Sequence, residues 1–174
     1  MAAGAASVFL AGPVRTAGRA LSIASALRLH DHVSHTRLVL ELSEEVEFSL
    51  FRLADPYRVV VDLPELDWAV GNQALEPVGL VHAVRFGLFQ AGNARIVLDL
   101  AGPAHVKNAF TLPATGGTPF RFVVDLEATD RAPFMAVLGP ENRIGKFGVP
   151  VTPKTVAAQP RPGKDSTVGA SSPK

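Results

Sequence analysis

The sequence predicts an all-β protein, a β-sandwich of two symmetry-related four-stranded sheets produced by an internal duplication. Apolar and polar positions alternate from Ala26 to Glu127, and no apolar stripe of helical period persists for three turns. A hexapeptide of the form arginine, apolar, valine, apolar, acid, leucine occurs four times, as RLVLEL, RVVVDL, RIVLDL and RFVVDL. These two observations together predict strands, and they predict that the strands repeat.

Eight strands are expected, separated by short polar or proline-bearing turns. The first half contributes residues 26–30, 36–42, 46–53 and 57–63. The second half contributes residues 81–89, 94–100, 105–112 and 120–127.

The spacing of the hexapeptides indicates the duplication. Arg37 and Arg95 are 58 residues apart, and Arg58 and Arg121 are 63 apart. The segment ATGGTP before the last strand is longer than its counterpart ADP and accounts for the difference. Each half needs the other to bury its apolar face, so two packed sheets follow, either one per half or with strands exchanged between the halves.

Alternation within the hexapeptide assigns its faces, because successive side chains of a strand point to opposite sides of the sheet. In the second copy Val59, Val61 and Leu63 share an apolar face that points to the core, and Arg58, Val60 and Asp62 point outward. Between antiparallel neighbours, the arginine of one strand can lie opposite the acid of the next. Such a ladder fixes the register, since a slip of one residue would bury both charges.

Composition excludes several classes of function. The chain has 174 residues, a formal net charge of +1 and no cysteine. A domain this close to neutral is a poor candidate for nucleic-acid binding. Without cysteine it has no disulfide framework, zinc–thiolate site or thiol nucleophile.

Both ends of the chain differ from the repeat. Residues 1–23 begin with an uncharged, alanine-rich run that is too short to span a bilayer, so no transmembrane segment is expected. The run is interpreted as the end of an export signal whose start is missing, or as a disordered leader. Residues 132–174 are rich in proline, glycine, serine and lysine and are predicted to form an extended linker or tail.

The segments LADPYRVVVDLP and RIVLDLAGP, within residues 24–131, resemble the AMIN domain. That domain occurs at the N-terminus of periplasmic N-acetylmuramoyl-L-alanine amidases and in secretin subunits of type IV pili. The resemblance implies a β-sandwich of two symmetry-related four-stranded sheets. It also implies a periplasmic, non-catalytic module that binds peptidoglycan and places an amidase at the division septum. The alternative is a protein-docking domain of a pilus or secretion secretin complex.

For the amidase interpretation, peptidoglycan is the expected partner, with divisome or other envelope proteins as further partners and no cofactor. The zinc catalytic domain of such an amidase would follow the linker and is absent from this sequence, which predicts either a fragment or a stand-alone targeting domain. The candidate ligand contacts are six arginines on the outer faces, whose guanidinium groups suit the carboxylates of stem peptides, and the single tryptophan. They are Arg28, Arg37, Arg58, Arg85, Arg95, Arg121 and Trp68.

Other arrangements of reactive side chains are weaker candidates. His30 and His32 could share a strand face near His35, but a third metal ligand is not evident. Glu65 and Asp67 lie in the connection between the halves, where carboxylates are usually solvated rather than paired for glycosidase chemistry. Trp68 lies in the same connection and either contacts a sugar or closes the end of the sandwich. No metal site and no catalytic residue is therefore predicted.

Overall fold

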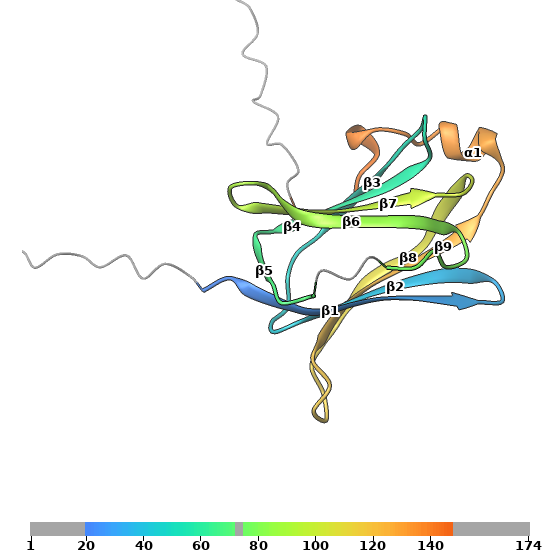
Figure 1. Cartoon of the computed structure of the whole chain (residues 1–174). Helices are drawn as coiled ribbons and strands as arrows, with labels where there is room; N and C mark the ends of the chain where they lie inside the picture. The colour runs from blue at the N-terminus through green and yellow to red at the C-terminus, as the bar shows by residue number, and fades with distance from the viewer. Residues whose placement is uncertain (1–19, 72–74, 148–174) are drawn as a thin grey trace, which may run out of the picture.

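The computed structural model describes residues 20–71 and 75–147 and shows two β-sheets packed face to face (Figure 1). Sheet A has the strand order β5-β1-β2-β9-β8, and sheet B has the order β10-β3-β4-β7-β6. The strands are β1 (Ser22–His32), β2 (His35–Leu42), β3 (Ser49–Leu53), β4 (Arg58–Pro64), β5 (Leu66–Trp68), β6 (Val81–Gln90), β7 (Asn93–Leu100), β8 (Ala104–Leu112), β9 (Phe120–Ala128) and β10 (Ile144–Gly145). The predicted all-β sandwich is confirmed.

Strands are exchanged between the two halves of the sequence. In sheet A, β1 and β2 of the first half pair with β9 and β8 of the second, and in sheet B, β3 and β4 pair with β7 and β6. The junctions are the antiparallel pairs β2–β9 and β4–β7, which are the four strands that carry the hexapeptides. Each sheet therefore has the four strands predicted, plus one short strand at an edge, β5 or β10.

The core is built from the second, fourth and sixth positions of the hexapeptides, as predicted. All twelve of these side chains are buried in one cluster between the sheets. They are Leu38, Leu40, Leu42, Val59, Val61, Leu63, Ile96, Leu98, Leu100, Phe122, Val124 and Leu126. Between the two sheets, Phe48 packs on Phe122 with ring centroids 4.7 Å apart, which adds to the apolar contact that holds the layers together.

The outward face of the hexapeptide strands is less solvated than the alternation predicts. Val60 and Val123 are only 2% and 3% exposed, although both lie on the side of their sheet away from the core. Val60 lies beside Phe51 in the register of β3 and β4, and the side chains of Arg95 and Arg143 lie over the Phe51 ring. Long arginine stems can cover apolar surface in this way. Val60 thus points away from the core, as predicted, but its neighbours cover it, so it is not solvated.

The chain immediately after the repeat packs onto sheet B. The helix α1 (Arg131–Met135) buries Phe134, whose ring meets Tyr57 edge-on at 5.0 Å. The 3-10 turn η1 (Pro140–Asn142) leads to β10, which pairs with β3. The extended linker predicted for residues 132–174 is therefore wrong for α1, η1 and β10, although Phe134 is the only buried side chain among the described residues 134–147. The predicted leader up to residue 19 and the rest of the tail, residues 148–174, lie outside the described residues.

Candidate functional site

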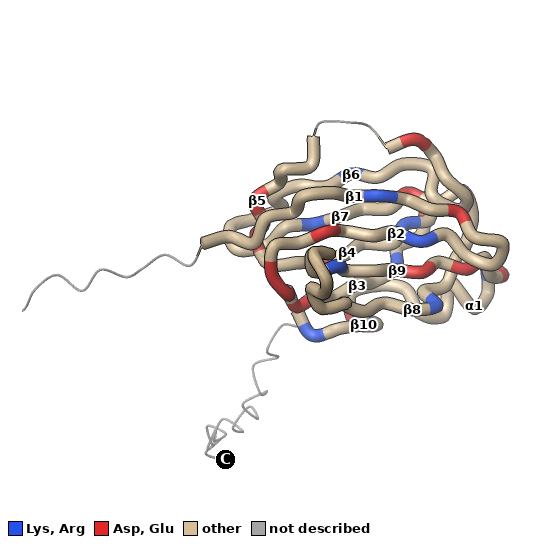
Figure 2. Tube along the Cα trace, turned by 90° about the horizontal axis from the view of Figure 1, so that it is seen from below, with Lys and Arg blue, Asp and Glu red and all other residues tan. Residues whose placement is uncertain are grey.

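The outer faces of the two sheets carry the predicted charge ladder. In sheet A, Arg37 lies opposite Asp125 and Glu41 lies opposite Arg121. In sheet B, Arg58 lies opposite Asp99 and Asp62 lies opposite Arg95. Figure 2 shows the resulting alternation of acidic and basic positions along β2 and β9. The prediction that arginine and acid of neighbouring hexapeptides face each other is confirmed at all four positions.

The pair at the sheet A junction is a two-pronged contact with a buried carboxylate. Arg37 Nε and Nη2 donate to the two carboxylate oxygens of Asp125 at 2.6 and 2.9 Å, and Asn108 Nδ2 donates to the same group at 3.0 Å. Asp125 is 1% exposed. The Arg37 hydrogen bonds hold the pKa of Asp125 below its usual range; burial of the carboxylate opposes this effect but does not overcome it.

Sheet B repeats this contact by pseudo-symmetry and adds a third group. Arg95 Nε and Nη2 donate to Asp62 at 2.7 and 3.1 Å. Arg143, from the segment after the repeat, also donates to Asp62 at 2.7 Å and to Ser49 Oγ at 3.0 Å. The same carboxylate therefore binds two guanidinium groups, which leaves an excess of positive charge at this position.

The two opening strands provide another equivalent pair of arginines. Arg28 of β1 bonds to Glu41, and Arg85 of β6 forms a two-pronged contact with Asp99 at 3.0 and 2.9 Å. Both arginines are well exposed, with side-chain exposures of 52% and 63%. Their carboxylates are the ones that lie opposite Arg121 and Arg58 in the ladder.

Arg58 and Arg121 are left without a carboxylate. Among the described residues no acid lies within ion-pair distance of either guanidinium group; Arg58 Nε bonds only to the carbonyl of Pro56 at 3.3 Å, and the buried Arg121 Nε has no hydrogen-bond partner. Each therefore ends a row of arginine, acid and arginine that crosses the outer face of its sheet. The two rows, Arg28–Glu41–Arg121 and Arg85–Asp99–Arg58, each have one more positive than negative charge.

Trp68 lies in β5 on the flank of the sandwich, away from these rows. Its ring packs on Phe86 of β6 with centroids 4.7 Å apart and joins the edge of the core. This is the closing position that the sequence offered as the alternative to a sugar contact. Its Nε1 atom is buried with no hydrogen-bond partner in the described part of the chain.

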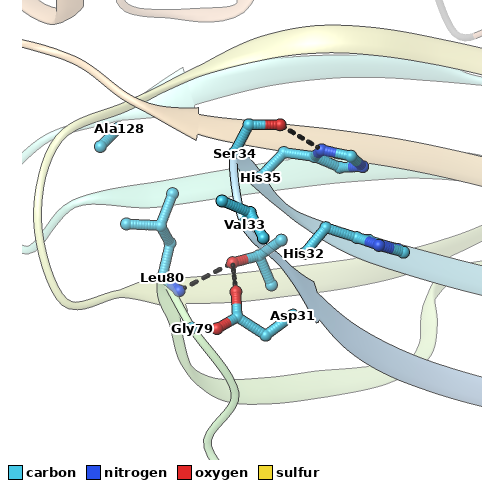
Figure 3. Close-up of a pocket in the computed structure, with 9 residues that line it drawn as sticks. Asp31, His32, Val33, Ser34, His35, Gly79, Leu80 and Ala128 are labelled. Carbon is cyan, nitrogen blue, oxygen red and sulfur yellow. Dashed lines mark hydrogen bonds between the residues drawn. The ribbon is translucent and has the colours of Figure 1, made fainter.

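The three N-terminal histidines lie at the β1–β2 hairpin, where a hollow of about 480 Å³ is lined by Asp31, His32, His35, Thr36 and Gly79 among others (Figure 3). His32 and His35 stack with ring centroids 4.6 Å apart, and Thr36 Oγ1 bonds to Asp31 and accepts the Leu80 amide. Within the described residues no three His, Cys, Asp or Glu side chains are grouped as metal ligands. The hydrogen bonds of this hollow tie the hairpin to the connection between the halves.

The paired carboxylates of that connection have separate roles. Glu65 accepts the Gly92 amide at 2.7 Å and so anchors the β6–β7 turn, whereas Asp67 is exposed on β5.

Sequence reasoning missed two residues that matter for the sheet B face, Arg143 and Phe89. Phe89 stacks on Arg95, with the guanidinium carbon 3.5 Å from the ring centroid. A sequence signal that could have pointed to Phe89 is the polar, glycine-containing segment FQAGN, residues 89–93, which Phe89 opens at the end of β6.

The fold and its faces define a duplicated β-sandwich module with charged rows on both outer surfaces. The AMIN domain family matches residues 26–126, more than half of the chain, and the chain therefore belongs to the AMIN domain family. Among curated proteins it is similar to the N-acetylmuramoyl-L-alanine amidases AmiC of Neisseria meningitidis serogroup B and of Escherichia coli O6:H1.

The two similarities have the same level of identity. The Neisseria protein is 29% identical over 150 residues, which cover 80% of this chain and 35% of that protein. The Escherichia protein is 29% identical over 173 residues, which cover 92% of this chain and 40% of that protein. The chain thus spans well under half the length of either relative. In the described residues no helix is both long and apolar enough to cross a membrane.

Proposed function

We propose that this chain is a periplasmic peptidoglycan-binding module that directs an N-acetylmuramoyl-L-alanine amidase activity to the division septum. The observation that carries the proposal is the pair of arginine rows, each ending in a guanidinium group that has no carboxylate partner among the described residues. Membership of the AMIN domain family and similarity to two amidases support it.

The chemistry of the rows suits a polymer that carries carboxylates. The acids in the middle of the rows hold Arg28 and Arg85 in place. Arg58 and Arg121 retain their terminal nitrogens as donors for a ligand, whereas Nε of Arg58 bonds to Pro56 and Nε of Arg121 is buried. A guanidinium group can bind a carboxylate through two parallel hydrogen bonds, and this geometry favours arginine over lysine. Stem peptides of peptidoglycan end in carboxylates, and the two faces could contact separate strands of the wall.

Replacement of Arg58 and Arg121 by glutamine tests this proposal. We expect each single variant to bind purified sacculi several-fold more weakly, and the double variant to bind more weakly still. Melting temperatures should barely change, because no ion pair of the described residues is lost. The loss should shrink as salt rises, since screening already weakens such contacts in the wild type. Co-sedimentation with sacculi over a salt series measures the effect.

Arg131→Gln is the matched control, because Arg131 lies on α1, outside the rows, and bonds to the Tyr57 hydroxyl at 2.8 Å. It removes the same charge and should leave binding unchanged. Wild-type protein that stays in the supernatant would refute the proposed function. Equal losses of binding for Arg131→Gln and Arg58→Gln would show that the lower net charge, and not the position of Arg58, weakens binding.

The same proposal predicts that this chain does not hydrolyse the wall. It spans 35% and 40% of the lengths of the two amidases, and we assign the catalytic domain to the remainder of such a protein. Sacculi incubated with this chain, with or without added zinc, should release no more stem peptide than with heat-killed protein. Zinc-dependent release above that background contradicts a purely targeting role.

Septal placement requires its own measurement. A fluorescent fusion exported to the periplasm should concentrate at division sites, and the double variant Arg58→Gln/Arg121→Gln should spread around the cell. A divisome or other envelope protein becomes the preferred partner if the double variant loses sacculus binding and still concentrates at the septum.

A further inference from the structure

The outer face of sheet B has a shallow hollow beside the β6–β7 turn, which we call the Phe89 hollow. It has a volume of about 190 Å³ and is lined by Arg85, Phe86, Gly87, Leu88, Phe89, Arg95 and Val97. Gly87 leaves room in it: apart from its two chain neighbours, no described residue has a heavy atom within 4 Å of the place where a Cβ would stand. Phe89 is 53% exposed and is the only aromatic among the strongly exposed large apolar side chains of the described residues.

The pseudo-symmetry of the domain shows that this hollow is particular to sheet B. Gly87 lies opposite Arg95 in the ladder, and the equivalent position opposite Arg37 in sheet A is His30. An imidazole therefore occupies the place that glycine leaves open. At the next outward position sheet A has His32, which stacks on His35, where sheet B has Phe89 stacked on Arg95. The two outer faces share their arginines but not this open place and ring.

The groups around the hollow are held in fixed positions. Arg95 is bound through Nε and Nη2 to Asp62, which Arg143 also holds, and it lies between the rings of Phe51 and Phe89. Arg85 is bound through the same two nitrogens to Asp99. Both guanidinium groups therefore keep Nη1 free to donate. The β6–β7 turn, which begins just after Phe89, is fixed by two hydrogen bonds between Glu65 and Gly92, at 2.7 and 3.1 Å.

The charge on this face favours an anionic ligand. In the described part of the chain, four guanidinium groups, those of Arg58, Arg85, Arg95 and Arg143, share the outer face of sheet B with the carboxylates of Asp62 and Asp99. A flat apolar ring beside oriented N–H donors suits a molecule that has one apolar face and polar substituents at its edge. A sugar ring that carries a carboxylate has this combination.

We propose that the Phe89 hollow binds one sugar ring that carries a carboxylate; the ring stacks on Phe89 and directs its carboxylate to Nη1 of Arg85 or Arg95. The proposal rests on the proposed function and extends it, because it assigns the glycan strand to sheet B. The carboxyl group of a muramic acid ring is free only where the stem peptide has been removed, so the hollow takes bare glycan, and Arg58 beyond it is left for the stem of another ring. It also makes the two outer faces unequal: sheet A can contact stems through Arg121 but has no equivalent ring platform.

Titration of the full ¹⁵N-labelled chain with N-acetylmuramic acid, followed by NMR, tests the proposal. We expect saturable shifts centred on the amides of Gly87, Phe89 and Arg95. N-acetylglucosamine, which has the same ring but no carboxylate, should bind at least several-fold more weakly. Phe89→Leu should remove the shifts, whereas Phe89→Tyr, which keeps the aromatic face, should retain them. Val33→Ala removes another exposed apolar side chain, at the β1–β2 turn, and should have no effect.

Three results would overturn the proposal: shifts confined to other surfaces, equal affinity for the two sugars, or unchanged binding in Phe89→Leu. Melting temperatures of the variants show whether any loss comes from unfolding. Sacculus sedimentation separates this proposal from the function on which it rests. If the wild type binds intact sacculi, and Phe89→Leu binds sacculi stripped of their stems by an amidase as well as the wild type does, the hollow is not a glycan site and the proposed function stands. If the wild type does not bind sacculi, the proposed function itself is wrong.

Discussion

Val61→Asp should abolish cooperative folding of the domain or reduce its free energy of unfolding by at least about 4 kcal/mol. Val61 is fully buried at the centre of β4, between Leu50 of β3 and Ile96 of β7, which are also fully buried. A carboxyl group there has no hydrogen-bond donor from a side chain nearby, and burial of an unpaired polar or charged group costs several kcal/mol. Domains of this size have a total free energy of unfolding of roughly 5–15 kcal/mol, so this single change should remove a large part of it or all of it. Urea unfolding followed by circular dichroism measures it.

The control for this change must be an outward valine that is still partly solvated. Val60 is unsuitable because its neighbours bury it. Val39 of β2, which also points outward and is partly exposed, is the better control. Val39→Thr should cost less than about 1 kcal/mol, as expected for a partly exposed position away from the core. Similar losses in the two variants would show that the core and outer faces of the hexapeptide have been assigned incorrectly.

The buried faces of the strands and the register between them were predictable because the hexapeptide pattern determines both. Apolar residues at alternate positions select the core side, and the arginine and acid, four residues apart, can meet only across an antiparallel junction. This is why RVVVDL and RIVLDL face each other with Asp62 opposite Arg95. The sequence left open whether each half forms its own sheet, since the same alternation suits both arrangements.

Which arginine binds which carboxylate was not predictable. Asp99 lies between Arg58 on one neighbouring strand and Arg85 on the other, and only the three-dimensional arrangement shows that Arg85 takes it. The same choice at Glu41 leaves Arg121 without a carboxylate. Of the six candidate arginines, two thus have no carboxylate among the described residues, a distinction that depends on strand order and side-chain conformation.

The segment after the repeat gave no sequence signal because its contacts are few and individually specific. Phe134 is buried against Tyr57, and Arg143 binds Asp62, yet neither belongs to a periodic pattern. Glycine and proline around them are typical of a linker. A composition-based reading averages over such isolated anchors, which is why the predicted tail and the structured segment overlap.

Asp125→Asn should lower the free energy of unfolding by about 3 kcal/mol near neutral pH. Breaking a buried ion pair by removing one partner costs roughly 3–5 kcal/mol, and the lower value applies because the Arg37 side chain is 35% exposed and can regain water. Asparagine preserves the size of the side chain, so the loss reports the carboxylate and its bonds to Arg37 and Asn108 rather than a cavity.

Asp99→Asn is the matched control, because Asp99 forms the same two-pronged contact but with an arginine that is 63% exposed. It should cost less than about 1 kcal/mol, as exposed ion pairs usually do. Equal losses in the two variants would show that the buried Asp125 pair contributes no more to the free energy of unfolding than an exposed pair does.

The difference between wild type and Asp125→Asn should also depend on pH in a defined direction. The Arg37 hydrogen bonds lower the pKa of Asp125 in the folded state, whereas an unfolded aspartate titrates near about 3.9. The stability that this group contributes is therefore fully present above the unfolded pKa and is lost as the pH falls through the lower folded value. We expect a constant difference above about pH 5 that shrinks progressively in more acidic solution. Because His35 Nε2 lies 3.6 Å from Asp125, the series should be repeated in a His35→Gln background, which removes any contribution from that imidazole. A difference that grows on acidification in both backgrounds would contradict the ionised, arginine-bound state of Asp125.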